Sequence, residues 1–188
     1  MRVSREQMVE NRARILREAS RLFREHGFAA VTVADVMKAA GQTHGGFYSH
    51  FASKDDLIAA TIAEAMTGDG SGMADLEAWT NAYLSPLHRD HPEHGCPTAS
   101  LAGLMRQQSP AVRGAMATGL NAQLERFAAV LPGGGDAERR RAAIGQWSAM
   151  VGAVMLARAV DDPALSDELL AETRAWLAEK ATASGAST

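Results

Sequence analysis

TVADVMKAAGQTHGGFYSHFASK, residues 32–54, predicts two short helices joined by a tight glycine turn. The Thr32 hydroxyl is placed to accept an amide hydrogen bond in the first turn, with Asp35 as its partner three residues later. Gly41 ends this helix, because glycine adopts the left-handed conformation at little cost, and Thr43 opens the second helix. The expected apolar face of the first helix comprises Val33, Val36, Met37 and Ala40. Such a pair of helices is the motif that places its second member in the major groove of DNA.

Helices are also expected on both sides of this motif. Ser4 with Gln7 predicts a capping box at the start of the chain, and Gly27 predicts the end of the helix that follows. Ser53 with Asp56 predicts the start of a fourth helix. The side chains expected to be buried are Ile15, Leu16, Ala19, Leu22 and Phe23 before the motif, and Leu57, Ile58, Ile62 and Met66 after it.

The rest of the chain reads as further helices. The segment GDGSG at 68–72 is a break in composition, so we expect a DNA-binding domain at 1–66, including the linking helix, and a second domain at 67–188. Helices are predicted at 73–84, 98–108, 109–131, 136–160 and 166–180, with a loop at 85–97, a break at 132–135 and a frayed tail after Lys180. The predicted fold class is all-α, with about nine helices.

The composition restricts the compartment. The chain has 188 residues, of which 46% are hydrophobic and 5% aromatic, and it contains no apolar run of transmembrane length. Its first residues lack the apolar core of a signal peptide, so we expect a cytoplasmic protein that does not enter a membrane. Cys96 is the single cysteine, which excludes a disulfide within the chain and is typical of a reducing compartment.

The charge is distributed unevenly. The net charge is −3, but residues 1–60 carry +2, and residues 1–24 alone carry +4. We interpret this as a basic N-terminal face on an acidic body, the alternative being an arginine-rich solvated helix. Arg2 and Arg5 are candidates to enter a minor groove as a flexible arm, with a disordered tail as the alternative for Arg2.

Residues 11–62 resemble the DNA-binding domain of the TetR family of bacterial transcriptional repressors. The resemblance is carried by ILREASRLFREHGF, TVADVMKAAGQTHGGFYSHF and SKDDLI, while GCP at 95–97 and MVGAVMLARAVDDPALSDELL at 150–170 look like one branch of the family. It implies an N-terminal helix-turn-helix domain and a C-terminal helical domain for ligand binding and dimerisation. It also implies a homodimer on double-stranded DNA with a palindromic operator, released when a small-molecule inducer binds. Repression is the expected output, with activation as the alternative.

The second helix of the motif, Thr43–Phe51, is the expected DNA reader. Its N-terminus offers free amides to a phosphate, and Thr43 is expected either to contact phosphate or only to cap the helix. Gly45 and Gly46 are unusual, because each costs roughly 1 kcal/mol relative to alanine inside a helix. We interpret them as sites where the backbone approaches DNA, the alternative being a short helix that tolerates them.

Five further side chains complete the predicted DNA interface. Tyr48 and Lys54 resemble the phosphate-contacting tyrosine and lysine of the family, and His50 has a polar head that is expected to reach phosphate. Phe47 and Phe51, spaced i and i+4, are instead expected to be core anchors. Gln42 and His44 are candidates for base edges, since sequence is read by hydrogen-bonding groups in the major groove. For each of these two, an ordinary surface role is the alternative.

The C-terminal part supplies candidates for an inducer pocket, although core packing is the default for apolar residues at helical spacing. Methionines and aromatic residues make adaptable pocket walls, and the expected inducer is mostly apolar or aromatic. The candidates are Trp79, Tyr83, Cys96, Leu101, Met105, Met116, Leu120, Phe127, Trp147 and Met150.

Cys96 has two interpretations. Because it precedes Pro97 and the start of a helix, it is a candidate thiolate sensor of electrophiles or oxidants, or else a small residue that packs a turn. A zinc site in the histidine-rich segment 88–96 matches no familiar spacing, so we expect no metal and no cofactor. A hydrolase using Cys96 with His88 or His94 lacks an oxyanion arrangement, and we expect no enzymatic activity.

Overall fold

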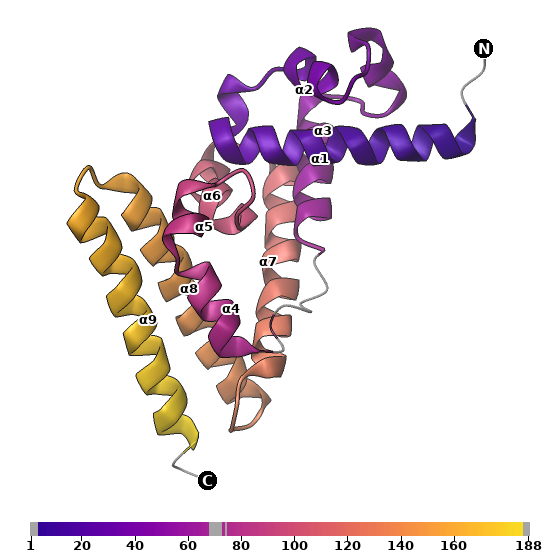
Figure 1. The fold of residues 1–188 in the computed structure, drawn as a ribbon. Coiled ribbons are helices and arrows are strands. Elements are labelled where there is room, and N and C mark those ends of the chain that lie inside the picture. Colours follow the sequence, from indigo (N-terminus) through magenta and orange to yellow (C-terminus); the bar gives the residue numbers. More distant parts are fainter. Residues whose placement is uncertain (1–3, 68–72, 74, 186–188) are drawn as a thin grey trace.

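A computed structural model describes residues 4–67, 73 and 75–185, and all regular structure within these ranges is helical. The predicted all-α class is confirmed. Figure 1 shows α1 lying across one end of the molecule, roughly perpendicular to the long helices α7, α8 and α9. None of the described helices has the length and apolar character needed to cross a membrane.

The N-terminal part contains the predicted motif. Its elements are α1 (Arg5–Ala30), α2 (Val33–Ala39), the 3-10 helix η1 (His44–Ser49) and α3 (Lys54–Ala65). Thr32 and Asp35 form the predicted reciprocal cap, in which the Thr32 hydroxyl accepts from the Asp35 amide at 3.2 Å and the Asp35 carboxylate accepts from the Thr32 amide at 2.9 Å. Gly41 has the predicted positive φ, +66°.

Three local predictions in this part need correction. The Ser4 hydroxyl caps α1 by accepting from the Gln7 backbone amide. The Gln7 side chain donates to the Glu10 and Asn11 side chains, so the capping box is not reciprocal. Gly27 breaks α1 with φ 76°, yet helical structure resumes as far as Ala30. The reader is a short 3-10 helix that ends at Ser49, two residues earlier than predicted.

The C-terminal part is built from helices of two sizes. Its elements are α4 (Leu76–Tyr83), α5 (Pro86–Asp90), α6 (Pro97–Leu101), the 3-10 helix η3 (Ala102–Gln107), α7 (Pro110–Val130), α8 (Asp136–Ala159) and α9 (Pro163–Gly185). The predicted Ser109 cap is present, since its hydroxyl accepts from the Val112 amide. The predicted break at 68–72 and the last three residues of the predicted tail lie outside the described residues.

Other predicted boundaries are wrong. The segment 85–97 is not all loop, because Ser85 caps the short helix α5. The single helix predicted at 98–108 is divided between α6 and η3. The last helix begins at Pro163, three residues earlier than predicted, because the Asp162 carboxylate accepts from the Ala164 and Leu165 amides.

A shared core joins the two parts. The buried cluster of the helix-turn-helix continues into α6, η3 and α7 through Leu101, Met105, Val112 and Met116. A second cluster lies among α4, α7, α8 and α9. Where α3 ends, the Met66 carbonyl accepts from Arg126 Nη2 at 3.0 Å, and Met66 packs directly against Gly119. The N-terminal domain is therefore anchored to α7 by packing as well as by the chain.

Candidate functional site

The predicted reader η1 is held by its inner face. Phe47 and Phe51 are buried as predicted, and their rings stack with centroids 5.7 Å apart. The Gly46 amide donates to the Thr43 carbonyl at 3.0 Å, which closes the first 3-10 turn. The Thr43 hydroxyl makes no capping bond. Of the two roles predicted for Thr43, capping through the side chain is therefore excluded, and its exposed hydroxyl is available to a partner.

The outer face of η1 is open to solvent. Tyr48 is 73% exposed, and its ring meets only the edge of Phe47, at a centroid distance of 5.2 Å. His44 and Thr43 are also exposed. Such polar groups beside an apolar anchor suit contact with a hydrated, charged surface such as the DNA backbone.

Neither glycine of η1 is required by the fold. Gly45 and Gly46 both have ordinary negative φ. A Cβ added at Gly45 would meet nothing within 4 Å, and one at Gly46 would make only ordinary contacts, the nearest 3.5 Å away at the Thr43 hydroxyl. The chain itself therefore supplies no packing reason for glycine at Gly45.

Two predicted contact residues are engaged within the protein. The Gln42 amide group donates to the Asn11 side chain at 3.2 Å, which turns Gln42 towards α1. The Lys54 ammonium donates to the Phe28 carbonyl at 2.6 Å and so joins the start of α3 to the end of α1. An ammonium has three donors, so Lys54 keeps capacity for a phosphate, whereas Gln42 is better placed to position the turn.

His50 lies next to an arginine that sequence reasoning did not single out. Partial burial and then the positive charge of Arg12 lower the pKa of His50 below its ordinary value. The Arg12 guanidinium lies over the Phe51 ring, 4.8 Å from its centroid. Arg12 is exposed and seven residues after Arg5, so both lie on one face of α1. That heptad spacing is the signal that could have identified Arg12.

Arg5 does not belong to a flexible arm. It is the first residue of α1, directly after the Ser4 cap, so Arg5 is helical, and its contact with a minor groove stays a prediction; Arg2 lies outside the described residues. Ion pairs neutralise other arginines of α1, since Arg14 pairs with Glu10 and Arg21 pairs with Glu18 and Glu25. Among the residues the structure describes, no carboxylate forms an ion pair with Arg5, Arg12 or Arg17.

The predicted pocket residues divide between the two clusters. Leu101, Met105 and Met116 belong to the core shared with the N-terminal domain, and Leu120 contacts both clusters. The others, Trp79, Tyr83, Cys96, Phe127, Trp147 and Met150, lie in the second cluster. The predicted pocket is therefore not one set of neighbours.

Aromatic rings form the centre of the second cluster. The Trp79 and Trp147 rings stack at 5.8 Å, and Tyr83 lies 5.4 Å from each of them. Phe127 completes the group at 5.6 Å from Trp79. The buried Trp147 indole nitrogen has no hydrogen-bond partner among the described residues. Burial, and then the neighbouring Cys96, raise the pKa of the Tyr83 hydroxyl well above its ordinary value. An apolar, aromatic surface with an unused polar group suits a flat ligand.

His88 fixes the segment before α6. Its Nδ1 lies 2.7 Å from the Tyr83 carbonyl, and its Nε2 lies 2.9 Å from the Cys96 backbone nitrogen. A carbonyl only accepts and a backbone amide only donates, so His88 is neutral and protonated at Nδ1. Burial is the main cause that lowers its pKa. Because Nε2 is occupied by the Cys96 amide, His88 is not placed as a base for the Cys96 thiol.

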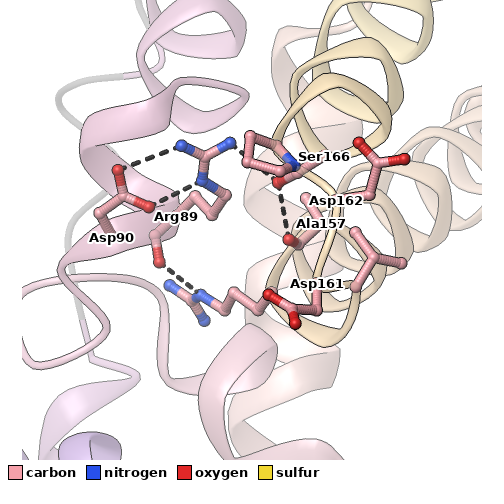
Figure 2. A pocket seen from close by; sticks show the side chains of 9 residues that line it. Arg89, Asp90, Ala157, Asp161, Asp162 and Ser166 are labelled. Carbon is pink, nitrogen blue, oxygen red and sulfur yellow. Dashed lines mark hydrogen bonds and ion pairs between the residues drawn. The ribbon is translucent and has the colours of Figure 1, made fainter.

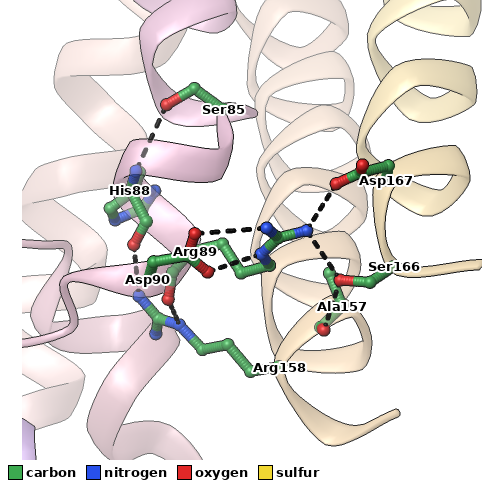
Figure 3. Close-up of polar contacts among 8 residues, drawn as sticks. All are labelled: Ser85, His88, Arg89, Asp90, Ala157, Arg158, Ser166 and Asp167. Carbon is green, nitrogen blue, oxygen red and sulfur yellow. Dashed lines mark hydrogen bonds and ion pairs between the residues drawn. The ribbon is translucent and has the colours of Figure 1, made fainter. Parts of the chain in front are cut away.

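Figure 2 shows a polar surface pocket beside α5 and the α8–α9 turn, and Figure 3 shows polar contacts around it. The pocket has a volume of about 350 Å³. Arg89 donates to Asp90, Asp167 and Ser166, and Arg158 donates to the backbone carbonyls of Arg89 and His88. The arginines therefore clamp α5 to α8 and α9. None of the predicted pocket residues lines this pocket. The described residues also contain no group of three or more His, Cys, Asp or Glu positioned to share a metal ion.

Sequence comparisons match the N-terminal part. Residues 15–61 match the family model of bacterial regulatory proteins, tetR family. The HTH-type transcriptional regulator TtgR of Pseudomonas putida is 39% identical over 62 residues, which are 33% of this chain and 30% of that protein. The HTH-type transcriptional repressor AcnR of Corynebacterium diphtheriae is 33% identical over 94 residues, 48% of this chain and 46% of that protein. The matches thus span less than half of either relative.

Solved structures share the fold over nearly the whole chain. The reduced form of NemR from E. coli superimposes with a TM-score of 0.73 at 19% identity, covering 89% of this chain and 96% of that one. A TetR transcriptional regulator from Legionella pneumophila also gives a TM-score of 0.73, at 20% identity, covering 89% and 95%. At these identities the likeness concerns the fold.

Proposed function

Because this chain belongs to the TetR family of bacterial regulatory proteins, we propose that it is a dimeric, ligand-responsive transcriptional repressor. It binds a palindromic operator in double-stranded DNA and releases it when a small, mostly apolar or aromatic inducer binds the C-terminal domain. The proposal places the protein in the cytoplasm, together with its DNA.

The exposed face of η1 is the observation that carries the proposal. Phe47 and Phe51 anchor this short helix from inside, while Thr43, His44 and Tyr48 remain exposed and Gly45 leaves its backbone bare. We assign Tyr48, Thr43 and Lys54 to phosphates, together with His50 and Arg12. His44 is the remaining candidate for a base edge, since Gln42 is turned towards Asn11.

An apolar stripe supports dimerisation through the last two helices. Ile144, Met155 and Leu156 of α8 and Leu165 and Trp176 of α9 are large apolar side chains that remain exposed. A Cβ added at Gly145 or Gly152 of α8 would meet nothing within 4 Å, so α8 also presents a small-residue surface to solvent. We propose that a second copy covers this stripe as a four-helix bundle, which sets the two readers roughly 34–36 Å apart.

The inducer is proposed to act through connections between the domains. Arg24 of α1 donates to the Gly95 carbonyl at 2.7 Å, next to the aromatic cluster. Met66 at the end of α3 contacts Gly119 and Arg126 of α7. A ligand that moves α7 or the segment around Gly95 shifts the N-terminal domain, so inducer and operator favour different separations of the readers.

Fluorescence anisotropy with double-stranded oligonucleotides tests the proposal. We expect an affinity that falls steeply with salt, because binding neutralises phosphates and releases counterions. Sites mapped in the source genome supply the operator sequence and the neighbouring genes. Light scattering after size exclusion is expected to give a dimer. A protein with no salt-sensitive affinity for any duplex at low ionic strength would overturn the proposal, and a strict monomer would overturn its dimeric form.

A further inference from the structure

The turn between α2 and η1 has a polar residue where an apolar one is common. The Gly41 amide donates to the Lys38 carbonyl at 3.1 Å. The Gln42 amide donates to the Met37 carbonyl at 2.8 Å. This pair of bonds is the Schellman motif, in which the residue after the glycine frequently makes an apolar contact with the last turn of the helix. Gln42 is half-buried, and its side chain instead donates to Asn11 of α1 at 3.2 Å.

Asn11 is a buried acceptor that two glutamines share. Asn11 is 9% exposed, and its Oδ1 accepts from Gln42 Nε2 and from Gln7 Nε2, each at 3.2 Å. Gln7 lies four residues earlier on the same helix and also reaches the Glu10 carboxylate at 3.5 Å. The Gln42 side chain has no other hydrogen-bond partner among the residues that the structure describes. Loss of the Asn11 oxygen would therefore leave Gln42, but not Gln7, without an acceptor.

Aromatic contacts hold the inner face of η1. Phe47 and Phe51 stack on each other in the core, and the guanidinium of Arg12, the next residue of α1, lies over the Phe51 ring. Apolar packing has no preferred direction, so it fixes how deeply a short helix is seated better than how it is rotated. A hydrogen bond is directional. The bond between Asn11 and Gln42 therefore adds a directional contact with α1 at the start of the reader.

We propose that Asn11 is a positioning residue for DNA recognition, which fixes the rotation of η1 through its hydrogen bond to Gln42. The proposal rests on the proposed function, because it concerns how the same reader distinguishes one DNA sequence from another. Groups that read bases must be held within about 0.5 Å of their productive positions, whereas phosphate contacts carry no sequence information directly. Loss of the bond should therefore lower discrimination between duplexes more than it lowers affinity for DNA in general.

Binding measurements on two duplexes test the proposal with the full-length protein. The probes are the duplex that wild type selects from a random-sequence pool, and a scrambled duplex of the same length and composition. Asn11→Leu removes the acceptor and keeps a side chain of similar size, and we expect the ratio of the two affinities to fall about tenfold. The salt dependence on the scrambled duplex should stay at its wild-type value, since the phosphate contacts remain. An unchanged ratio, or an equal loss on both duplexes, would overturn the proposal.

Two variants around the same oxygen are the matched controls. Gln7→Leu removes the other donor to Asn11 and should keep the wild-type ratio. Asn11→Asp keeps an acceptor oxygen, so it should also keep the ratio, although its added negative charge lowers the affinity for both duplexes alike. A ratio as low as that of Asn11→Leu in either control would contradict the assignment to this hydrogen bond.

A double variant distinguishes positioning from direct contact with DNA. Gln42→Leu should lower the ratio as much as Asn11→Leu does, and the combination should lower it no further, because both changes remove the same bond. A further fall of about tenfold in the combination would show that the two residues act independently, which overturns the proposal. Because Gln42 lies in a half-buried turn, Gln42→Leu also tests the bond if Asn11→Leu does not fold.

Hydrogen exchange without DNA separates this proposal from the proposed function. Relative to the amides of α8, the Gln42 backbone amide is expected to exchange about tenfold faster in Asn11→Leu than in wild type, because the turn opens more readily. It should keep its wild-type rate in Gln7→Leu. An unchanged rate in Asn11→Leu would overturn the proposal. Wild type that binds no duplex would instead overturn the proposed function, and the exchange rates would still decide whether Asn11 holds the turn.

Discussion

The chain has two tyrosines, and they lie in opposite surroundings. Tyr48 is 73% exposed on η1, and Tyr83 is 7% exposed among the aromatic rings of the second cluster. An unpaired hydroxyl on the surface is solvated, whereas the same group unpaired in the interior costs about 1–3 kcal/mol. The comparison shows that the exposed tyrosine is free to meet another molecule, while the buried one packs within the protein, where burial and the neighbouring Cys96 raise its pKa.

The largest effect is expected on DNA affinity, from variants at and next to the exposed face of η1. Tyr48→Ala and Lys54→Ala should each weaken binding to all duplexes by about 1–3 kcal/mol, or roughly tenfold to a hundredfold. Lys54→Ala should also reduce the salt dependence by about one counterion, since it removes a positive charge from the interface. Anisotropy titrations at several salt concentrations measure both effects.

Arg141→Ala is the control for these variants, because it removes one exposed positive charge from α8, outside the N-terminal domain. It should leave the affinity and the salt dependence near wild type. Wild-type binding by both reader variants would contradict the assignment of the interface.

The packing of α3 against α7, which joins the N-terminal domain to the C-terminal part, is tested by a pair of glycines on α7. A Cβ at Gly119 would lie 2.7 Å from the Met66 side chain, whereas one at Gly114 would meet nothing within 4 Å. Gly119→Ala should therefore lower the free energy of unfolding by about 1–3 kcal/mol, through overpacking between α3 and α7. Gly114→Ala should raise it by up to about 1 kcal/mol through helix propensity. Urea unfolding of both variants measures the difference; equal changes would contradict the packing described.

Replacing each tyrosine by phenylalanine tests the comparison between the exposed Tyr48 and the buried Tyr83 directly. Tyr83→Phe should change the free energy of unfolding by no more than about 1 kcal/mol, because the neighbour of the buried hydroxyl is the Cys96 sulfur, which is only a weak acceptor. Tyr48→Phe should leave it unchanged, because that hydroxyl is solvated in both the folded and the unfolded chain. Thermal and urea unfolding of the two variants check this. A loss of stability well above about 1 kcal/mol in Tyr83→Phe would show that its hydroxyl has a stronger partner than Cys96.

Gly45→Ala separates the effect on stability from the effect on DNA affinity at the exposed helix η1. The added methyl group has free space within the protein, so stability should rise by a few tenths of a kcal/mol up to about 1 kcal/mol. Binding to DNA should nevertheless weaken about tenfold if the backbone approaches a phosphate there. Unchanged affinity in the anisotropy titration would favour the alternative, a glycine that is merely tolerated.

The smallest effect is the pH dependence of the free energy of unfolding that arises from the half-buried His88. Burial lowers the pKa of His88 from its ordinary value of 6.5, so the unfolded chain takes up a proton at a higher pH than the folded protein does. Stability is therefore complete above about pH 7 and falls as the pH drops through 6.5, with His50 contributing in the same direction. His88→Gln should reduce this fall, whereas His26→Gln, at an exposed site, should retain it. Urea unfolding at about pH 7.5 and pH 5.5 measures the slope.

Local hydrogen bonds explain why much of the fold could be predicted. The caps formed by Ser4, Thr32, Ser53 and Ser109 join groups three residues apart, so the residue types alone determine them. The missed start of α9 follows the same rule, since Asp162 precedes Pro163 as Ser109 precedes Pro110. The 3-10 form of η1 was not predictable in this way, because its length is set by how Phe47 and Phe51 fit the core.

The candidate sites were predictable to different extents. At the reader, apolar spacing correctly separated the buried Phe47 and Phe51 from the exposed Tyr48 and His44. In the body, composition indicated aromatic and methionine side chains but could not divide them, since Leu101 and Trp147 belong to different clusters. That division depends on which helices pack together, and residue type carries no information about it.

The sequence by itself determined the helices, their caps, the glycine turn at Gly41 and the anchored reader, because each depends on neighbours within one or two helical turns. Only the tertiary structure decided that Gln42 turns to Asn11, that Arg24 reaches Gly95, and that Tyr83 and Cys96 share His88. The first two of these contacts join groups 31 and 71 residues apart, and all of them depend on how the helices pack. A hydrophobic pattern states which face of a helix is buried, but the partner of that face follows from the packing of the whole chain.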